Sequence, residues 1–125
     1  MKIRIIVGEI RLEAELLANE TAQAIYQALP IESGFSTWGD EIYFSIPVKR
    51  ELEKGTTDVE MGDLGYWPPG KAFCIFYGPT PASDTDKPVP ASKVTVIGRV
   101  IGDATVLRDA AASKIRLEPV SAESE

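Results

Sequence analysis

The chain of 125 residues contains no histidine, and this absence removes the commonest general base and the commonest metal ligand. A Ser-His-Asp triad and a Cys-His pair are both excluded. Any catalysis would have to use carboxylates, lysine, tyrosine, backbone dipoles or apolar surface. The sequence indicates no catalytic residue, no metal ligand set and no cofactor.

Cysteine occurs once, as Cys74, so no disulfide can form within the chain. A reducing cytosol suits such a residue, and we expect a cytoplasmic protein. Cys74 lies in an apolar segment, where a cysteine usually packs as a small hydrophobic side chain. The alternative, a nucleophilic thiol, has no histidine to support it.

Long apolar runs and clusters of basic residues are also missing. No segment approaches the roughly 18 apolar residues that span a bilayer, and the alternating start MKIRIIVGEIRLEAEL has no signal-peptide pattern. The net charge is −6, and the thirteen Lys and Arg residues are scattered along the chain, with Lys49-Arg50 the one adjacent pair. We therefore expect neither a membrane nor a nucleic acid as partner, and we interpret the acidity as serving solubility.

The length and an apolar content of 44% fit one globular domain. Residues 1–120 are predicted to form it, with 121–125 as a flexible tail. Alternating polarity over Lys2–Val7 and Glu9–Leu17, with a turn at Gly8, predicts a hairpin. Spacing of apolar residues at i, i+3, i+4 and i+7 then predicts a helix that Asn19 or Thr21 caps and Pro30 ends.

The remaining pattern is dominated by short strands between glycine and proline turns. We predict that Gly62–Gly70 is a corner, that Gly98 marks a bulge or a close backbone approach, and that Asp103 caps a short helix over 104–111. The predicted fold is mostly β, a closed barrel of about eight strands with one or two short helices. Its later strands are predicted at Ile42–Val48, Ala72–Tyr77, Val94–Val100 and Lys114–Glu118. Pro47 bends the first of these strands or places it at an edge, and the second is predicted to be covered.

Several motifs resemble those of cyclophilins in the same order along the chain. These are LLANETA at 16–22, YFSIP at 43–47, FCI at 73–75 with PTP at 79–81, and VTVIGRV at 94–100. Two longer motifs, WGDEIYF at 38–44 and DLGYWPPGKAFCIFYGPTP at 63–81, resemble a small prokaryotic group of cyclophilin-like proteins. The resemblance covers most of the chain and implies a cyclophilin-like barrel.

Cyclophilins are prolyl cis/trans isomerases, which need an apolar pocket for the proline ring and a donor, an arginine in that family. The resemblance puts that arginine near Phe44 or Ser45 and the family glutamine near Ala72, so neither matches. The family tryptophan and histidine after the PTP turn have no counterpart in 82–93. Arg50 or Arg99 could supply a donor from another direction.

Aromatic residues beside the glycine and proline turns are the candidate binding residues, because they combine contact area with a polar group. The alternative for each is core or corner packing. Asp40, Glu41 and Asp63 could form a coupled pair or a weak cation site, or simply close turns. The predicted binding set is Trp38, Glu41, Tyr43, Tyr66, Trp67, Phe73 and Phe76.

Three functions remain open at the level of the sequence. The first is a non-catalytic binding module for a peptide segment or a small amide-like metabolite, since cyclophilin-like domains also occur within amide-hydrolysing carboxylase-type enzymes. The second is a divergent prolyl isomerase. The third is a scaffold or subunit that acts through a homo-oligomeric surface.

Overall fold

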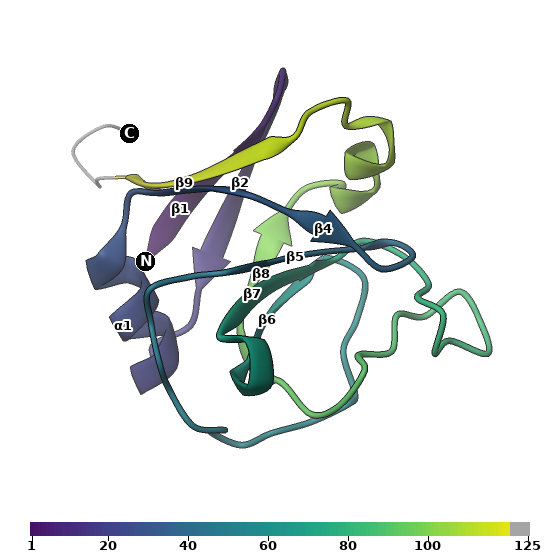
Figure 1. Ribbon diagram of the computed structural model, residues 1–125, viewed down its shortest axis with the longest axis horizontal. Helices are drawn as coiled ribbons and strands as arrows, with labels where there is room; N and C mark the ends of the chain where they lie inside the picture. The colour runs from purple at the N-terminus through teal and green to yellow at the C-terminus, as the bar shows by residue number, and fades with distance from the viewer. Residues whose placement is uncertain (121–125) are drawn as a thin grey trace.

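The computed structural model describes residues 1–120, which form one twisted, nearly closed antiparallel barrel (Figure 1). The predicted tail, 121–125, lies outside the described residues. The elements are β1 (Lys2–Val7), β2 (Ile10–Leu16), α1 (Glu20–Ala28), β3 (Ile31–Gly34), β4 (Ser36–Thr37), β5 (Glu41–Ser45), β6 (Asp63–Trp67), the 3-10 turn η1 (Pro68–Gly70), β7 (Ala72–Phe76), β8 (Thr95–Ile101), the 3-10 helix η2 (Ala104–Asp109) and β9 (Lys114–Val120).

The strand order explains why the sheet curls into a barrel. It is β3-β9-β1-β2-β8-β6-β7-β5-β4, and every strand pairing is antiparallel. The two edge strands, β3 and β4, are consecutive in the chain and separated only by Phe35. The predicted mostly β barrel is confirmed, with nine strands over 1–120 where about eight were expected.

The N-terminal third follows the sequence closely. Gly8 adopts a positive φ of 62° in the turn that pairs Val7 with Ile10. Asn19 caps α1, because its side-chain oxygen accepts the Ala22 N–H at 2.8 Å, and its Nδ2 donates to the Val96 carbonyl of β8 at 3.0 Å. This pair of bonds fixes α1 to the barrel.

β7 is buried on both faces, as its uninterrupted apolar sequence predicts. Phe73 and Ile75 point into the barrel interior, which holds the main core. Cys74 and Phe76 point outward into a second, smaller core cluster with Ala72, Val59 and Val94. Because this outer cluster covers β7, the barrel has a packed outer face where a site can be built.

The predicted corner at Gly62–Gly70 is wrong, because Asp63–Trp67 form strand β6 between β7 and β8. Gly65 is not a turn residue. A Cβ there would lie 3.2 Å from both the Phe76 ring and a Val94 methyl group, so the glycine makes room for the outer cluster. The turns lie at the two ends of β6, at Gly62, whose φ is 92°, and in η1.

Other boundaries also differ from the prediction. The strand expected over Ile42–Val48 begins at Glu41 and ends at Ser45, two residues before Pro47. The helix expected over 104–111 is the shorter 3-10 helix η2, capped by Asp103 as predicted. The sequence analysis did not predict strands β3 and β4. Over residues 1–120, no helix is long and apolar enough to cross a membrane.

The prediction for Gly98 is confirmed. The β6–β8 register shifts between Leu64, opposite Gly98, and Gly65, opposite Val96. On the other side, a Cβ at Gly98 would lie 2.3 Å from the Glu15 carbonyl oxygen of β2. Both the bulge and the close approach therefore occur at this residue.

Candidate functional site

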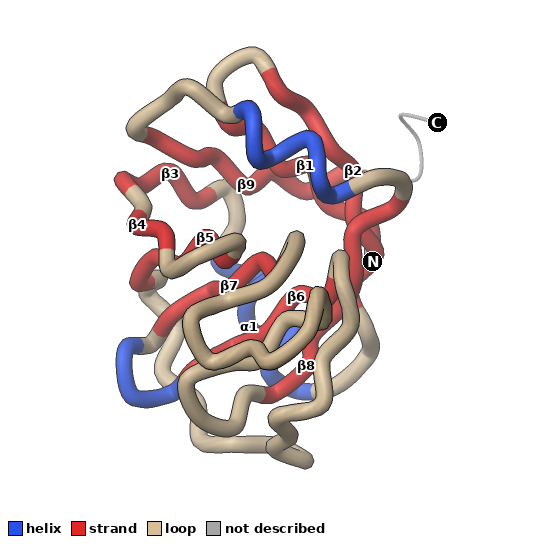
Figure 2. The backbone as a smooth tube through the Cα atoms, turned by 90° about the vertical axis from the view of Figure 1, so that its right-hand side faces the viewer, coloured by secondary structure: helices blue, strands red, loops and turns tan. Residues whose placement is uncertain are grey.

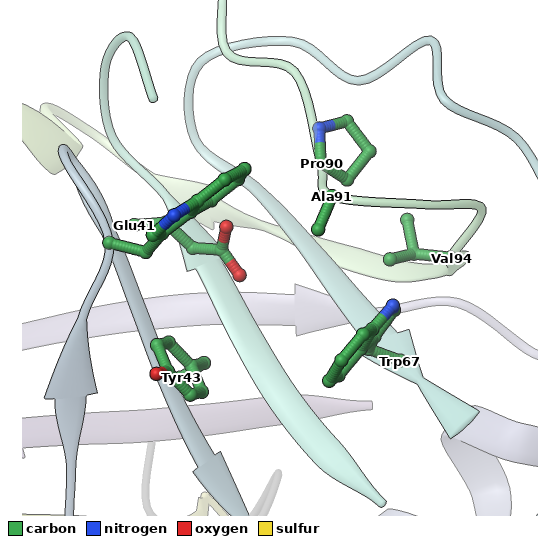
Figure 3. Close-up of a pocket in the computed structure, with 7 residues that line it drawn as sticks. Glu41, Tyr43, Trp67, Pro90, Ala91 and Val94 are labelled. Carbon is green, nitrogen blue, oxygen red and sulfur yellow. The ribbon is translucent and has the colours of Figure 1, made fainter. Parts of the chain in front are cut away.

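An apolar pocket of about 250 Å³ lies on the outer face of the barrel, above the second core cluster (Figure 3). Three of its lining residues are aromatic and one is acidic. The lining residues are Trp38, Glu41, Tyr43, Trp67, Pro90, Ala91 and Val94. A pocket of this size is large enough for one small organic group.

Strand alternation places the side chains. Glu41 and Tyr43 are two residues apart on β5 and share its outer face, while Ile42 between them is in the main core. On β6, Trp67 points outward and Tyr66 inward for the same reason. The loop before β8 supplies the remaining wall, and Figure 2 shows long loops crossing this side of the molecule near β6, β7 and β8.

A tight turn fixes Trp38 relative to Glu41. The Trp38 backbone N–H donates to the Glu41 carbonyl at 2.9 Å. Gly39 has a φ of 60°, and a Cβ there would lie 2.8 Å from the Thr80 Cα, so only glycine fits. Asp40 accepts from Arg108 Nε at 2.9 Å, which connects the turn to η2.

Trp67 is held on two sides. Its indole Nε1 donates to the Ser92 hydroxyl at 2.7 Å, which connects β6 to the covering loop. A Cβ at Gly70 would lie 3.0 Å from the indole ring, so the ring packs directly on the η1 backbone. The ring therefore forms a fixed wall of the pocket.

The loop that carries Pro90 is held by its own hydrogen bonds. The buried Thr80 hydroxyl donates to the Val89 carbonyl at 2.5 Å, and the Thr80 N–H donates to the Ser83 hydroxyl at 2.9 Å. The Asp40 N–H donates to the Pro79 carbonyl at 2.9 Å. The pocket wall formed by the loop is thus fixed to the turn that bears Trp38.

Glu41 is the one buried acidic residue of residues 1–120, with 7% of its surface exposed. Burial raises the pKa of its carboxyl group to about 7, and a hydrogen bond with the Cys74 side chain opposes part of that rise. Among the described residues, no Lys or Arg forms an ion pair with it. Figure 3 shows the carboxyl group directed into the space near Trp67 and Ala91.

Four of the seven predicted binding residues lie together in the pocket: Trp38, Glu41, Tyr43 and Trp67. The other three do not line it. Tyr66 is fully buried, with its hydroxyl donating to the Val48 carbonyl at 2.6 Å. Phe73 packs on Phe44 in the main core, and Phe76 belongs to the cluster that supports the pocket from below.

The three acidic residues that the sequence analysis considered together have different surroundings in the structure. Asp40 pairs with Arg108, and Asp63 lies 3.9 Å from Arg99, while Glu41 faces the pocket. In residues 1–120, no group of three acidic or cysteine side chains is placed to hold a metal ion. Pro90 and Ala91 were missed because the polar loop 82–92 carries no pocket signal of its own, and Val94 was predicted only as the first residue of a strand.

The sequence and the barrel are both similar to those of known proteins. A model of cyclophilin-like proteins matches residues 1–118. The protein belongs to the cyclophilin-like family. It is similar to a hypothetical protein, AF2241 from Archaeoglobus fulgidus, whose solution structure superposes with a TM-score of 0.80 at 44% identity and covers 96% of this chain and 95% of that chain. No curated protein matches.

Within this cyclophilin-like barrel, the residues that the motif resemblance places near the catalytic arginine of cyclophilins have other contacts. Phe44 is in the main core, and the exposed Ser45 hydroxyl donates to the Gly70 carbonyl at 2.9 Å. Arg50 pairs with Glu20, and Arg99 with Asp63. No arginine therefore lines the pocket among the residues described here.

Proposed function

We propose that the protein is a non-catalytic binding module whose pocket receives one group of a peptide segment or of a small metabolite. The observation that carries the proposal is the pocket itself, with aromatic walls around one buried carboxyl group. Binding sites for small molecules are typically concave and mostly apolar, with a few placed polar atoms that orient the ligand.

The rigidity of the walls supports a binding role. The Trp67 ring is fixed by Ser92 and Gly70, and the turn at Gly39 fixes the backbone of Trp38. Walls held in this way lose little conformational entropy when a ligand enters, so more of the contact energy is retained as affinity.

The polar chemistry of the pocket is compatible with an amide. In its acid form the Glu41 carboxyl group can donate to a carbonyl and accept from an N–H, which is the pattern that a primary or secondary amide presents. A pKa of about 7 keeps a large share of that acid form near neutral pH. This supports the small amide-like metabolite and the peptide backbone as ligand classes.

The test is a two-dimensional amide NMR titration with an Ala-Pro peptide and with N-methylacetamide. We expect shifts at Trp38, Glu41, Trp67 and Val94. Ala91→Phe places a ring in the pocket from an exposed position and should weaken binding at least tenfold. Ala82→Phe, at an exposed position of the same loop that does not line the pocket, should leave it unchanged.

The other outcomes each decide between functions. If exchange between the cis and trans signals of the Ala-Pro peptide accelerates, the protein is a divergent isomerase. If the resonances move only with protein concentration, the face is a self-association surface. If neither these ligands nor the ammonium probe described below shifts the pocket resonances, the binding proposal fails.

A further inference from the structure

The pocket combines two features that favour positive charge. Trp38, Tyr43 and Trp67 surround it, and among residues 1–120 the only aromatic ring pair is Phe44–Phe73, so the three pocket rings are not stacked on one another. Free aromatic faces attract cations through the ring quadrupole, most strongly for tryptophan.

The second feature is the carboxyl group of Glu41. It is buried and faces the pocket, and within the described chain it has no cationic partner. The titratable side chains around it are Cys74 of β7 and Tyr43 of β5, and neither can supply a positive charge. An isolated buried carboxylate is costly, and it is relieved either by a proton or by a cation.

We infer that the ligand group of this pocket is an organic cation, a methylated ammonium held by Trp38, Tyr43, Trp67 and the Glu41 carboxylate. The inference rests on the binding function proposed above and names its ligand class. It applies equally to a methylated amine of a metabolite and to a methylated lysine side chain, since both present the same group.

Methylation follows from the apolar character of the lining. A primary ammonium has three N–H donors and is strongly hydrated, whereas the acceptor oxygens among the lining side chains belong to the Glu41 carboxylate and the Tyr43 hydroxyl, at one side of an otherwise apolar pocket. A trimethylammonium has no N–H donor, so aromatic faces and one carboxylate satisfy it completely. The pocket volume of about 250 Å³ accommodates such a group. The net charge of −6 favours the approach of a cation from solution.

The decisive comparison uses choline and its uncharged isostere 3,3-dimethylbutan-1-ol, measured by isothermal titration calorimetry and NMR. We expect choline to bind at least tenfold more tightly. Glu41→Gln should remove most of this preference while changing the affinity for the alcohol less than threefold. Glu9→Gln, in the β1–β2 turn, removes the same charge away from the pocket and should have no effect.

The pH dependence of choline binding gives a second, independent test. With the carboxyl pKa near 7 in the free protein, choline must displace a proton at low pH, so it should bind about tenfold more tightly at pH 8 than at pH 6. The alcohol should show no such trend. Glu41→Gln should abolish the trend for choline.

Two results would overturn the inference while leaving the binding function intact. One is equal affinity for choline and the alcohol, which would mean that the pocket selects shape alone. The other is binding of N-methylacetamide without any binding of choline, which would assign the pocket to amides. The spectrum of each variant establishes that it is folded before its affinity is compared.

Discussion

At the scale of single residues, Glu41 sets the chemistry of the site. Its carboxyl group is held against Cys74 on a strand face that is otherwise apolar, and burial raises its pKa to about 7. The same desolvation raises the pKa of the Cys74 thiol well above its ordinary value, with the Glu41 charge adding to the effect. The thiol therefore stays protonated near neutral pH and is a poor nucleophile.

The raised pKa of Glu41 predicts a pH-dependent stability. The folded protein holds this proton up to about pH 7, whereas the unfolded chain releases it near pH 4.5, so the free energy of unfolding falls between those values as pH rises. At pH 8, the free energy of unfolding of Glu41→Gln, measured by urea unfolding, should therefore exceed that of the wild type by up to about 3 kcal/mol. At pH 5 the two should agree within about 1 kcal/mol.

The comparison with Glu9→Gln isolates this effect from the general loss of one negative charge. If Glu41→Gln is no more stable than Glu9→Gln at pH 8, the Glu41 carboxyl group is not destabilised by burial. The pH dependence expected for choline binding would then have no basis.

At the scale of elements, the contact between β2 and β8 depends on Gly98. A Cβ at this position would lie 2.3 Å from a backbone oxygen, which cannot move aside as a flexible side chain could. Gly98→Ala should therefore lower the free energy of unfolding by about 2–3 kcal/mol or more in urea unfolding. The strand pairing next to the bulge is the part that would have to shift.

Gly34→Ala is the matched control for Gly98→Ala. Gly34 also lies in a strand, but its φ is not positive and a Cβ there would lie 3.7 Å from the nearest atom, an ordinary contact. We expect a change below about 1 kcal/mol. Equal losses for the two variants would mean that glycine flexibility, and not the close approach, determines the cost.

β6 shows how far the sequence determines these elements. The stretch DLGYW was predicted as part of a corner because Gly65 and the following prolines are typical of turns. The structure uses Gly65 for close packing instead, a requirement that arises only when β7 and Val94 are in place. Had the strand been recognised, its alternation would have separated the buried Tyr66 from the pocket residue Trp67.

The pocket was predictable where its residues are close in sequence. Trp38, Glu41 and Tyr43 lie within six positions, and a turn followed by strand alternation brings them to one face. Pro90 and Ala91 were not predictable, because they reach the pocket through the hydrogen bonds of Thr80 and Ser92 to distant partners. Such contacts depend on how the chain returns across the barrel, which no local pattern records.

At the scale of the whole molecule, the barrel has one side with extensive strand pairing and burial, around β7, and a seam where the pairing is short. β7 pairs along its length with both β5 and β6 and is buried on both faces. The seam lies between β3 and β4, the two edge strands, and β4 has only two residues, both exposed. The pocket lies above β7, but its Trp38 wall directly follows β4.

Native-state hydrogen exchange should report this difference. We expect the amides of β7, such as Ile75, to exchange only when the whole domain unfolds, and the amides of Ser36 and Thr37 to exchange many-fold faster through local opening of the seam. If β7 exchanges as readily as β4, the outer cluster is not a permanent part of the fold, and the pocket above it is not preformed.

The placement of Trp38 and Trp67 has an optical consequence. The chain contains two tryptophans, and both line the same pocket. Excitation at the red edge of the absorption band, where the four tyrosines contribute little, makes the intrinsic fluorescence a signal from the pocket alone. The native protein therefore needs no added fluorophore. Changes in its emission wavelength, or in quenching by solutes, follow the state of the pocket during a stopped-flow experiment.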